Sequence, residues 1–90
     1  MQGLMMDTQL TVTSIMEFAE RVNSNAEIVS FTRDNPRHRC TYGEAFARAR
    51  QLANSVAGWG LEPGDRIATL AWNDYRHLET YYASACSGYV

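Results

Sequence analysis

The sequence contains no lysine, because all eight of its basic residues are arginines. Lysine side chains form Schiff bases, contact transferred phosphates in nucleotide-binding loops and act as polarising cations. None of these steps can be completed by residues of this chain. Any function that needs a lysine ammonium group is therefore excluded for these 90 residues taken alone.

Cysteine is also scarce, since Cys40 and Cys86 are the only two. Two cysteines cannot form a disulfide framework, and no Cys-x-x-Cys pair is present. Together with His38 and His77 they would supply four metal ligands, but their spacings match no zinc pattern. We expect two reduced thiols, two ordinary histidines and no metal site.

Long apolar runs and an excess of positive charge are missing as well. No run approaches the roughly 18 apolar residues that suggest a membrane span, so no transmembrane segment is expected. Residues 1–10 lack the basic start and apolar stretch of a secretory signal, which favours a cytoplasmic protein. A net charge of −2 argues against nucleic acid as a partner, because such binding depends on neutralising phosphates.

The composition is otherwise that of one small globular domain, with 46% hydrophobic residues. A chain of this length buries only about 60–65% of its unfolded surface, so its core is thin. Residues 1–12 begin with a polar stretch and are predicted to form a flexible N-terminal arm. The spacing Ser14-x-x-Glu17 predicts a capping box at the start of a first helix. An apolar face then follows with helical period, made of Ile15, Phe18, Ala19 and Val22.

Two strands and a second helix are predicted next. Residues 27–32 (EIVSFT) and 38–41 flank a turn with the sequence RDNPR, which indicates a β-hairpin. Thr41-x-x-Glu44 is a second capping box, and the helix behind it extends to about Val56, before Gly58 or Gly60. Residues 61–64 (LEPG) predict a type II turn.

The last part of the chain predicts half of a βαβ crossover. Residues 66–72 are expected to form a strand, Tyr75 to Ala85 a helix that ends near Gly88, and residues 89–90 the start of another strand. The fold class is therefore α/β, in the form of an α+β portion with a hairpin and the start of a βαβ unit. A chain with these elements leaves a strand without its partner, so we expect residues 1–90 to be an incomplete domain.

The stretch RIATLAWNDYRH places four polar residues, Asn73, Asp74, Arg76 and His77, after an apolar strand. Ligands of open parallel sheets gather beyond the carboxyl ends of strands, which makes this a candidate site. In the competing interpretation, Asn73 or Asp74 caps the last helix, where a carboxylate also suits the helix dipole. The spacing favours capping, because no serine or cysteine nucleophile lies near.

Two further groups each have two interpretations. A basic cluster on the hairpin could hold a phosphate or form a solvated edge; it comprises Arg33, Arg37, His38 and Arg39. An aromatic set could form a ligand platform or pack into the core; it comprises Trp72, Tyr75, Tyr81, Tyr82 and Tyr89. The solvated edge and core packing are favoured. The glycines around Trp59 follow a helix and precede a strand, the reverse of a nucleotide-binding loop.

Three motifs carry a resemblance to a known family. They are residues 41–44 (TYGE), 50–53 (RQLA) and 60–68 (GLEPGDRIA), and they resemble the opening of adenylate-forming enzymes, the AMP-binding acyl-CoA synthetase superfamily. Residues 70–83 (LAWNDYRHLETYYA) and the start MQGLMMD are similar to medium- and long-chain fatty-acid CoA ligases. The resemblance covers essentially the whole chain.

The resemblance implies a two-step reaction. ATP and a fatty acid give an acyl-adenylate and pyrophosphate, with Mg²⁺ offsetting phosphate charge, and the CoA thiol then displaces AMP. The family's phosphate loop, Thr-Glu motif, ribose-binding aspartate and C-terminal lysine match no position here. The resemblance therefore implies no catalytic, cofactor-binding or metal-binding residue within residues 1–90, and the fragment alone is expected to bind no ATP, Mg²⁺ or CoA.

The leading hypothesis is an N-terminal fragment of a fatty-acid CoA ligase that is inactive by itself. Its expected partners are the remainder of the ligase, fatty acid and CoA in the full-length enzyme, and a second copy in a homodimer. The alternative is a stand-alone α/β interaction or dimerisation module without enzymatic activity. The sequence does not define the acyl chain length.

Overall fold

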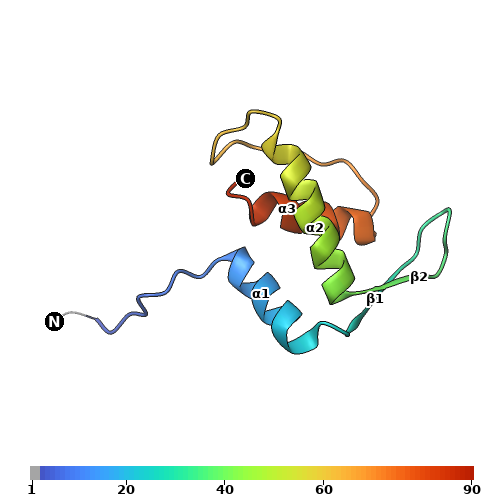
Figure 1. The fold of residues 1–90 in the computed structure, drawn as a ribbon, viewed down its shortest axis with the longest axis horizontal. Coiled ribbons are helices and arrows are strands. Elements are labelled where there is room, and N and C mark those ends of the chain that lie inside the picture. The colour runs from blue at the N-terminus through green and yellow to red at the C-terminus, as the bar shows by residue number, and fades with distance from the viewer. Residues whose placement is uncertain (1–2) are drawn as a thin grey trace.

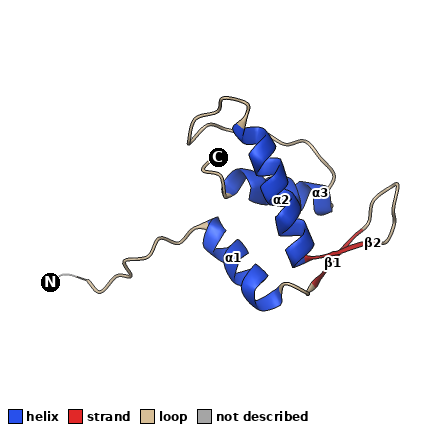
Figure 2. Ribbon diagram, in the orientation of Figure 1, coloured by secondary structure: helices blue, strands red, loops and turns tan. Residues whose placement is uncertain are grey.

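The computed structural model describes residues 3–90 and combines helices with one β-hairpin (Figures 1 and 2). The elements follow in the order α1 (Val12–Asn23), β1 (Glu27–Ser30), β2 (His38–Thr41), α2 (Tyr42–Ala57) and α3 (Tyr75–Ala85). This mixture confirms the expected fold class. Residues 3–10 of the predicted arm are exposed and precede α1. Val12, the last residue of that arm, is the first residue of α1. Met1 and Gln2 lie outside the described residues, and the arm's flexibility stays a prediction.

The predicted hairpin is confirmed, with a shorter first strand. β1 and β2 pair antiparallel from Glu27 opposite Thr41 to Ser30 opposite His38. The predicted strand end at Thr32 is wrong, because the chain already turns there. The Thr32 hydroxyl accepts a hydrogen bond from the Asn35 amide at 2.9 Å, and the Thr32 amide donates to the Asn35 carbonyl at 3.2 Å. These local bonds replace pairing across the strands.

The predicted capping box at the start of α2 is also confirmed. The Thr41 hydroxyl accepts from the Glu44 amide at 3.2 Å, and the Glu44 carboxylate accepts from the Thr41 amide at 2.9 Å. Two of the amides that a helix start leaves unpaired are thereby satisfied. At the other end Gly58 is the C-cap, and the left-handed conformation that favours glycine falls two residues later, at Gly60 (φ +74°).

The core lies between α2 and α3, which cross one another in Figure 1. Phe46 is only 1% exposed and is the largest fully buried side chain. Its ring stacks on Tyr42 at 5.5 Å between centroids and meets the edge of Tyr82 at 5.1 Å. Ala45 and Ala49 on the same helix are buried beside it. The buried residues of α2 recur at helical spacing, which places them on the one face that meets α3.

The start of α1 was predicted wrongly. Its N-cap is Thr11, whose hydroxyl accepts from the Ser14 amide at 3.2 Å, so Ser14 stands inside the first turn instead of capping it. The Ser14 hydroxyl in turn donates to the Thr11 carbonyl at 2.7 Å. A threonine with free access to that amide caps the helix one turn earlier, and the Ser14-x-x-Glu17 pattern has no capping role.

The side of α1 that packs also differs from the expected one. Met16 is buried, whereas Ile15, Phe18 and Val22 are each more than half exposed. α1 therefore meets the other helices through a narrow strip beside its apolar face, and most of that face remains open to solvent.

Residues 66–72 form an extended segment in place of the predicted strand. The Ile67 amide donates to the Val90 carbonyl at 2.8 Å, and the Val90 amide donates to the Asp65 carbonyl at 2.9 Å. This alternation is the pattern of a parallel pair, as expected at the start of a βαβ unit. The pairing stops there, and Trp72 is 91% exposed. The strand prediction is wrong for residues 68–72 because no neighbouring chain pairs with them among the described residues.

The turn predicted from Pro63 and Gly64 is confirmed. The turn comprises residues 62–65, with Pro63 and Gly64 at its centre, and is closed by a bond from the Asp65 amide to the Glu62 carbonyl at 3.0 Å, with Gly64 at φ +91°. No helix within residues 3–90 is long and apolar enough to cross a membrane.

Candidate functional site

The polar residues at positions 73–77 lie at the start of α3. Asp74 is the N-cap, and its Oδ1 atom accepts hydrogen bonds from the amides of Arg76 at 2.9 Å and His77 at 3.3 Å. These bonds satisfy donors that the first helical turn would otherwise leave free. Of the two candidates, Asn73 and Asp74, the structure therefore selects Asp74 as the cap.

Arg76 and His77 turn toward different parts of the chain. The Arg76 guanidinium binds Asp34 of the hairpin loop at 2.7 Å and donates to the Tyr75 hydroxyl at 3.1 Å. The hydrogen bond from Arg76 lowers the pKa of the exposed Asp34 carboxyl. His77 Nε2 lies 3.0 Å from the Thr69 hydroxyl. The Arg76 guanidinium also lies 3.8 Å from Asp74 Oδ2, so these two side chains form an ion pair at the start of α3, whereas the His77 ring contacts Thr69.

The basic cluster of the hairpin is divided between two faces. His38 points inward and stacks on the ring of Tyr75, with 3.6 Å between centroids and 9° between planes. Arg39 is exposed and forms an ion pair with Glu27 on the neighbouring strand. Arg33 and Arg37 are exposed near the turn. The three arginines of this cluster are therefore exposed to solvent, whereas His38 packs against Tyr75.

A buried polar cluster that the sequence did not indicate lies between β2, α2 and α3. It comprises Glu79, which is only 7% exposed, with His38, Arg48 and Tyr75 around it. Arg48 Nε lies 3.2 Å from Glu79 Oε1, and the Arg48 guanidinium carbon stands 5.1 Å from the centroid of the Tyr75 ring. In the sequence, this cluster could have been detected only through the four-residue spacing of Tyr75 and Glu79, which places both side chains on one face of a helix.

The electrostatics of this cluster are unusual for so small a protein. Burial raises the pKa of the Glu79 carboxyl, and the nearby charge of Arg48 opposes that shift. The contact of Arg48 with Glu79 is an ion pair without the geometry of a hydrogen bond, so Glu79 Oε1 has no hydrogen-bond partner among the described residues. His38 Nδ1 is likewise buried without a hydrogen-bond partner there. Burial also raises the pKa of the neighbouring Cys40 thiol, which keeps it protonated and unreactive.

The aromatic set is only partly in the core. Tyr75 is buried and Tyr82 packs against Phe46, as predicted. Burial raises the pKa of the Tyr82 hydroxyl. Tyr81 and Trp72 are exposed, so the core prediction is wrong for these two. Tyr81 meets only the edge of Tyr82, at 5.3 Å between centroids, and the set does not form a platform.

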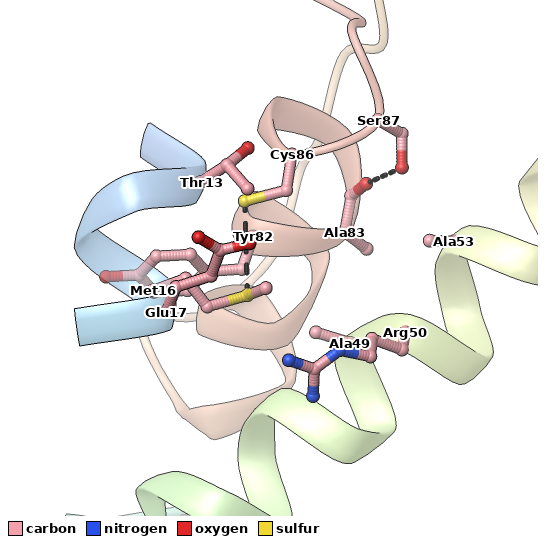
Figure 3. Close-up of a pocket in the computed structure, with 10 residues that line it drawn as sticks. All are labelled: Thr13, Met16, Glu17, Ala49, Arg50, Ala53, Tyr82, Ala83, Cys86 and Ser87. Carbon is pink, nitrogen blue, oxygen red and sulfur yellow. Dashed lines mark hydrogen bonds between the residues drawn. The ribbon is translucent and has the colours of Figure 1, made fainter. Parts of the chain in front are cut away.

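Figure 3 shows a pocket of about 230 Å³ between the three helices. Its floor is made of small residues, among them Ala49, Ala53 and Ala83. Cys86 faces it with its sulfur 3.9 Å from the sulfur of Met16, and no histidine belongs to the lining. A nucleophilic reaction needs a base within hydrogen-bond reach of the thiol, so this pocket does not have the arrangement of a catalytic site.

A second pocket of about 210 Å³ lies between the extended segment and α3, and it contains Thr69 and His77. The paired hydroxyl and imidazole have no carboxylate among the lining residues to orient them. Nowhere in residues 3–90 do three histidine, cysteine, aspartate or glutamate side chains gather in a way that could hold a metal ion.

Comparison with known proteins gives a family match over most of the chain. The model of the family described as AMP-binding enzyme matches residues 17–90. This range includes the turns at residues 32–35 and 62–65. It also includes all three motifs that resemble the opening of adenylate-forming enzymes. It leaves out only the N-terminal arm and the first turns of α1.

Similar proteins are acyl-CoA ligases from bacteria. The chain is 43% identical over all of its 90 residues to 3-methylmercaptopropionyl-CoA ligase of Ruegeria lacuscaerulensis, covering 17% of that protein. It is also 43% identical over its full length to medium-chain-fatty-acid–CoA ligase of Ectopseudomonas oleovorans, covering 16%. It is 40% identical over 96% of its length to long-chain-fatty-acid–CoA ligase of Thermus thermophilus, again covering 16%.

The chain thus spans about one sixth of the length of these relatives. Of the polar residues considered above, Asp74 caps α3, His38 stacks on Tyr75, and Arg76 and Arg39 form ion pairs. The matched range exceeds half of the chain and contains every motif quoted from the sequence except the start MQGLMMD. This protein belongs to the family of AMP-binding enzymes.

Proposed function

We propose that residues 1–90 are the N-terminal part of the AMP-binding domain of a fatty-acid CoA ligase, and that residues 3–10 belong to a flexible arm that precedes α1. In the complete enzyme ATP and a fatty acid form an acyl-adenylate and release pyrophosphate. The CoA thiol then attacks the acyl carbon and AMP leaves, which gives the thioester. The role of this chain is to supply the first helices and the first strand pairing of the domain.

One observation supports this proposal above the others. The similarity to acyl-CoA ligases extends over the whole chain, at up to 43% identity, while the chain spans only 16–17% of the ligases. The parallel hydrogen bonds between residues 65–67 and Val90 fit the same interpretation, because they begin a βαβ unit whose second strand would follow.

We further propose that the 90 residues are inactive alone and bind neither ATP, Mg²⁺ nor CoA. Phosphoryl chemistry uses cationic groups and carboxylate-held Mg²⁺ to neutralise developing charge. This chain has no lysine, and its carboxylates do not gather in the described residues. The residues present therefore do not fit the binding of ATP or of Mg²⁺, and no step of the reaction is assigned to them.

A pyrophosphate exchange assay tests this proposal. The isolated chain and a longer protein that begins with it are each incubated with ATP, Mg²⁺, labelled pyrophosphate and fatty acids of several lengths. We expect fatty-acid-dependent exchange from the longer protein only. Exchange by the 90 residues would overturn the claim of inactivity, and no exchange by the longer protein with any acid would overturn the assignment as a ligase.

The alternative function is a stand-alone interaction module, and the packed pair α2 and α3 favours it. Phe46 and its neighbours form a core without help from any other chain. A module predicts a dispersed NMR spectrum and a cooperative thermal transition from the 90 residues. A fragment with open apolar faces predicts broad signals or aggregation.

We propose two partners besides the substrates, namely the remainder of the ligase and a second copy of the protein. Sedimentation of the longer protein at several concentrations tests the second. We also propose that the enzyme works in the cytoplasm, where both ATP and CoA are present. Fractionation of cells that express a tagged protein tests this.

A further inference from the structure

The outer face of the hairpin combines apolar and basic side chains. Along β1 the side chains alternate, so that Ser30 is buried while Val29 and Phe31 are 57% and 78% exposed. Across the pair Val29 lies opposite the exposed Arg39, so an exposed β-branched side chain of one strand faces an arginine of the other. Phe31 and Arg37 are the exposed residues next to the last pair of the ladder, Ser30 and His38. In Figure 1 the hairpin stands at one end of the molecule, away from α1 and most of α2.

The charge of this face is opposite to that of the whole chain, which is −2. The two acids of the hairpin are already engaged, Glu27 by Arg39 and Asp34 by Arg76. Arg33 and Arg37 take part in none of the ion pairs found within residues 3–90. Phe31, Arg33 and Arg37 are thus exposed side chains of the same hairpin, and the two arginines have no ion-pair partner within residues 3–90.

We propose that this face, defined by Val29, Phe31, Arg33 and Arg37, docks on an anionic phospholipid surface. Guanidinium groups bind phosphate oxygens with two hydrogen bonds, and an aromatic ring beside them enters the apolar boundary of the headgroup layer. A free phosphate or nucleotide would use the arginines alone and leave Phe31 in water. Addition of a peptide strand is disfavoured, because strands of four residues offer few backbone partners.

Vesicle binding of the purified protein tests the proposal independently of any ligase activity. The protein is sedimented with vesicles of phosphatidylcholine alone or mixed with phosphatidylglycerol, at low and high salt. We expect binding only to the anionic vesicles, and a loss of binding at high salt because the charges are screened. Equal binding to both kinds of vesicle, or binding to neither, overturns the proposal.

Substitutions assign the binding to this face. Each arginine near an anionic membrane contributes a factor of about five, so Arg33→Gln with Arg37→Gln is expected to weaken binding about 20- to 30-fold. Phe31→Ser is expected to weaken it severalfold. Arg21→Gln on α1 and Trp59→Ser after α2 replace exposed residues elsewhere and are expected to leave binding unchanged. Circular dichroism checks that each variant keeps its helices.

The other possible occupants give distinct results, and each overturns the proposal. Binding that inorganic phosphate abolishes at millimolar concentration, with no effect of Phe31→Ser, indicates a free-phosphate site. Displacement from vesicles by a short polyglutamate peptide, with tighter binding to the peptide, indicates an acidic protein partner. A dimer that Phe31→Ser dissociates assigns the face to a second copy. Loss of vesicle binding in the longer ligase, while the 90 residues bind, indicates that the remainder of the polypeptide covers the face.

Discussion

The helix pair α2 and α3 and the region of α1 show two outcomes of the same sequence pattern. All three helices carry apolar residues at helical spacing. In α2 this pattern becomes a core, with Phe46 enclosed by two tyrosine rings. In α1 most of the pattern faces solvent, and Phe18 is 54% exposed. An amphipathic pattern therefore predicts a helix and an apolar face, while burial of that face requires a partner that only the rest of the fold provides.

The largest difference in stability between the pair α2 and α3 and the helix α1 is expected when one phenylalanine in each is replaced by alanine. Phe46→Ala removes a fully buried ring, and we expect the free energy of unfolding to fall by about 3–5 kcal/mol. The matched variant Phe18→Ala on α1 should change it by less than about 1 kcal/mol, because that ring is mostly in water. Urea denaturation followed by circular dichroism measures both. Equal losses would contradict the comparison.

A smaller effect is expected at the cap of α3. Asp74→Ala removes the acceptor of two amide hydrogen bonds and should cost about 0.5–2 kcal/mol of stability. Asn73→Ala is the control, since the adjacent side chain is exposed and the change should stay within about 0.5 kcal/mol. A larger loss from the Asn73 variant would show that the cap has been assigned to the wrong residue.

The buried carboxyl of Glu79, which lies in the well-packed region, predicts that the stability of the protein depends on pH. Its pKa in the folded protein is raised above the ordinary value of 4.5, mainly by burial. The folded state therefore holds this proton more tightly than the unfolded state. The associated stability is fully present below pH 4.5 and is lost as the pH rises through the folded pKa.

Glu79→Gln tests that sign, because the amide keeps the shape of the side chain and does not titrate. We expect its stability to vary less with pH than that of the unaltered protein above pH 4.5. Glu62→Gln, on the exposed turn, is the control and should keep the original pH dependence. A decline of the same slope in the Glu79 variant would show that another group is responsible.

The smallest effect is expected at the contact that ties α1 to α2. Arg50 binds Glu20 at 2.8 Å in a partly exposed ion pair. The pairing lowers the pKa of the Glu20 carboxyl through its hydrogen bond with Arg50. Such pairs contribute about 0–1 kcal/mol and are screened by salt. Glu20→Gln should therefore change stability by less than about 1 kcal/mol, with the difference shrinking at high salt. A loss comparable to that of Phe46→Ala would contradict the view that α1 is weakly held.

Local chemistry explains which parts of the fold could be predicted. The Thr41 and Glu44 capping box and the Pro63-Gly64 turn involve residues three apart, so their geometry is encoded over a few positions. The same reasoning failed at Ser14, because Thr11 competes for the same amide and the pattern alone does not rank the two.

Contacts between distant segments explain what could not be predicted. Glu79 and Arg48 are 31 positions apart, and nothing in the spacing of either indicates that they meet beside His38. Arg76 reaches Asp34 across 42 positions, which joins the start of α3 to the hairpin loop. The sequence identified the polar residues, but their partners depend on how the hairpin folds back on the helices.

By itself, the sequence determined that three helices, a hairpin and the Pro63-Gly64 turn form, that no lysine takes part, and that the chain resembles AMP-binding enzymes, because these depend on residue types and short spacings. The tertiary structure alone decided which apolar faces are buried, that Asp74 caps α3, and that Glu79 lies in a buried cluster with raised pKa. The physical reason is that burial and pairing are properties of two surfaces in contact, and a linear pattern specifies only one of them.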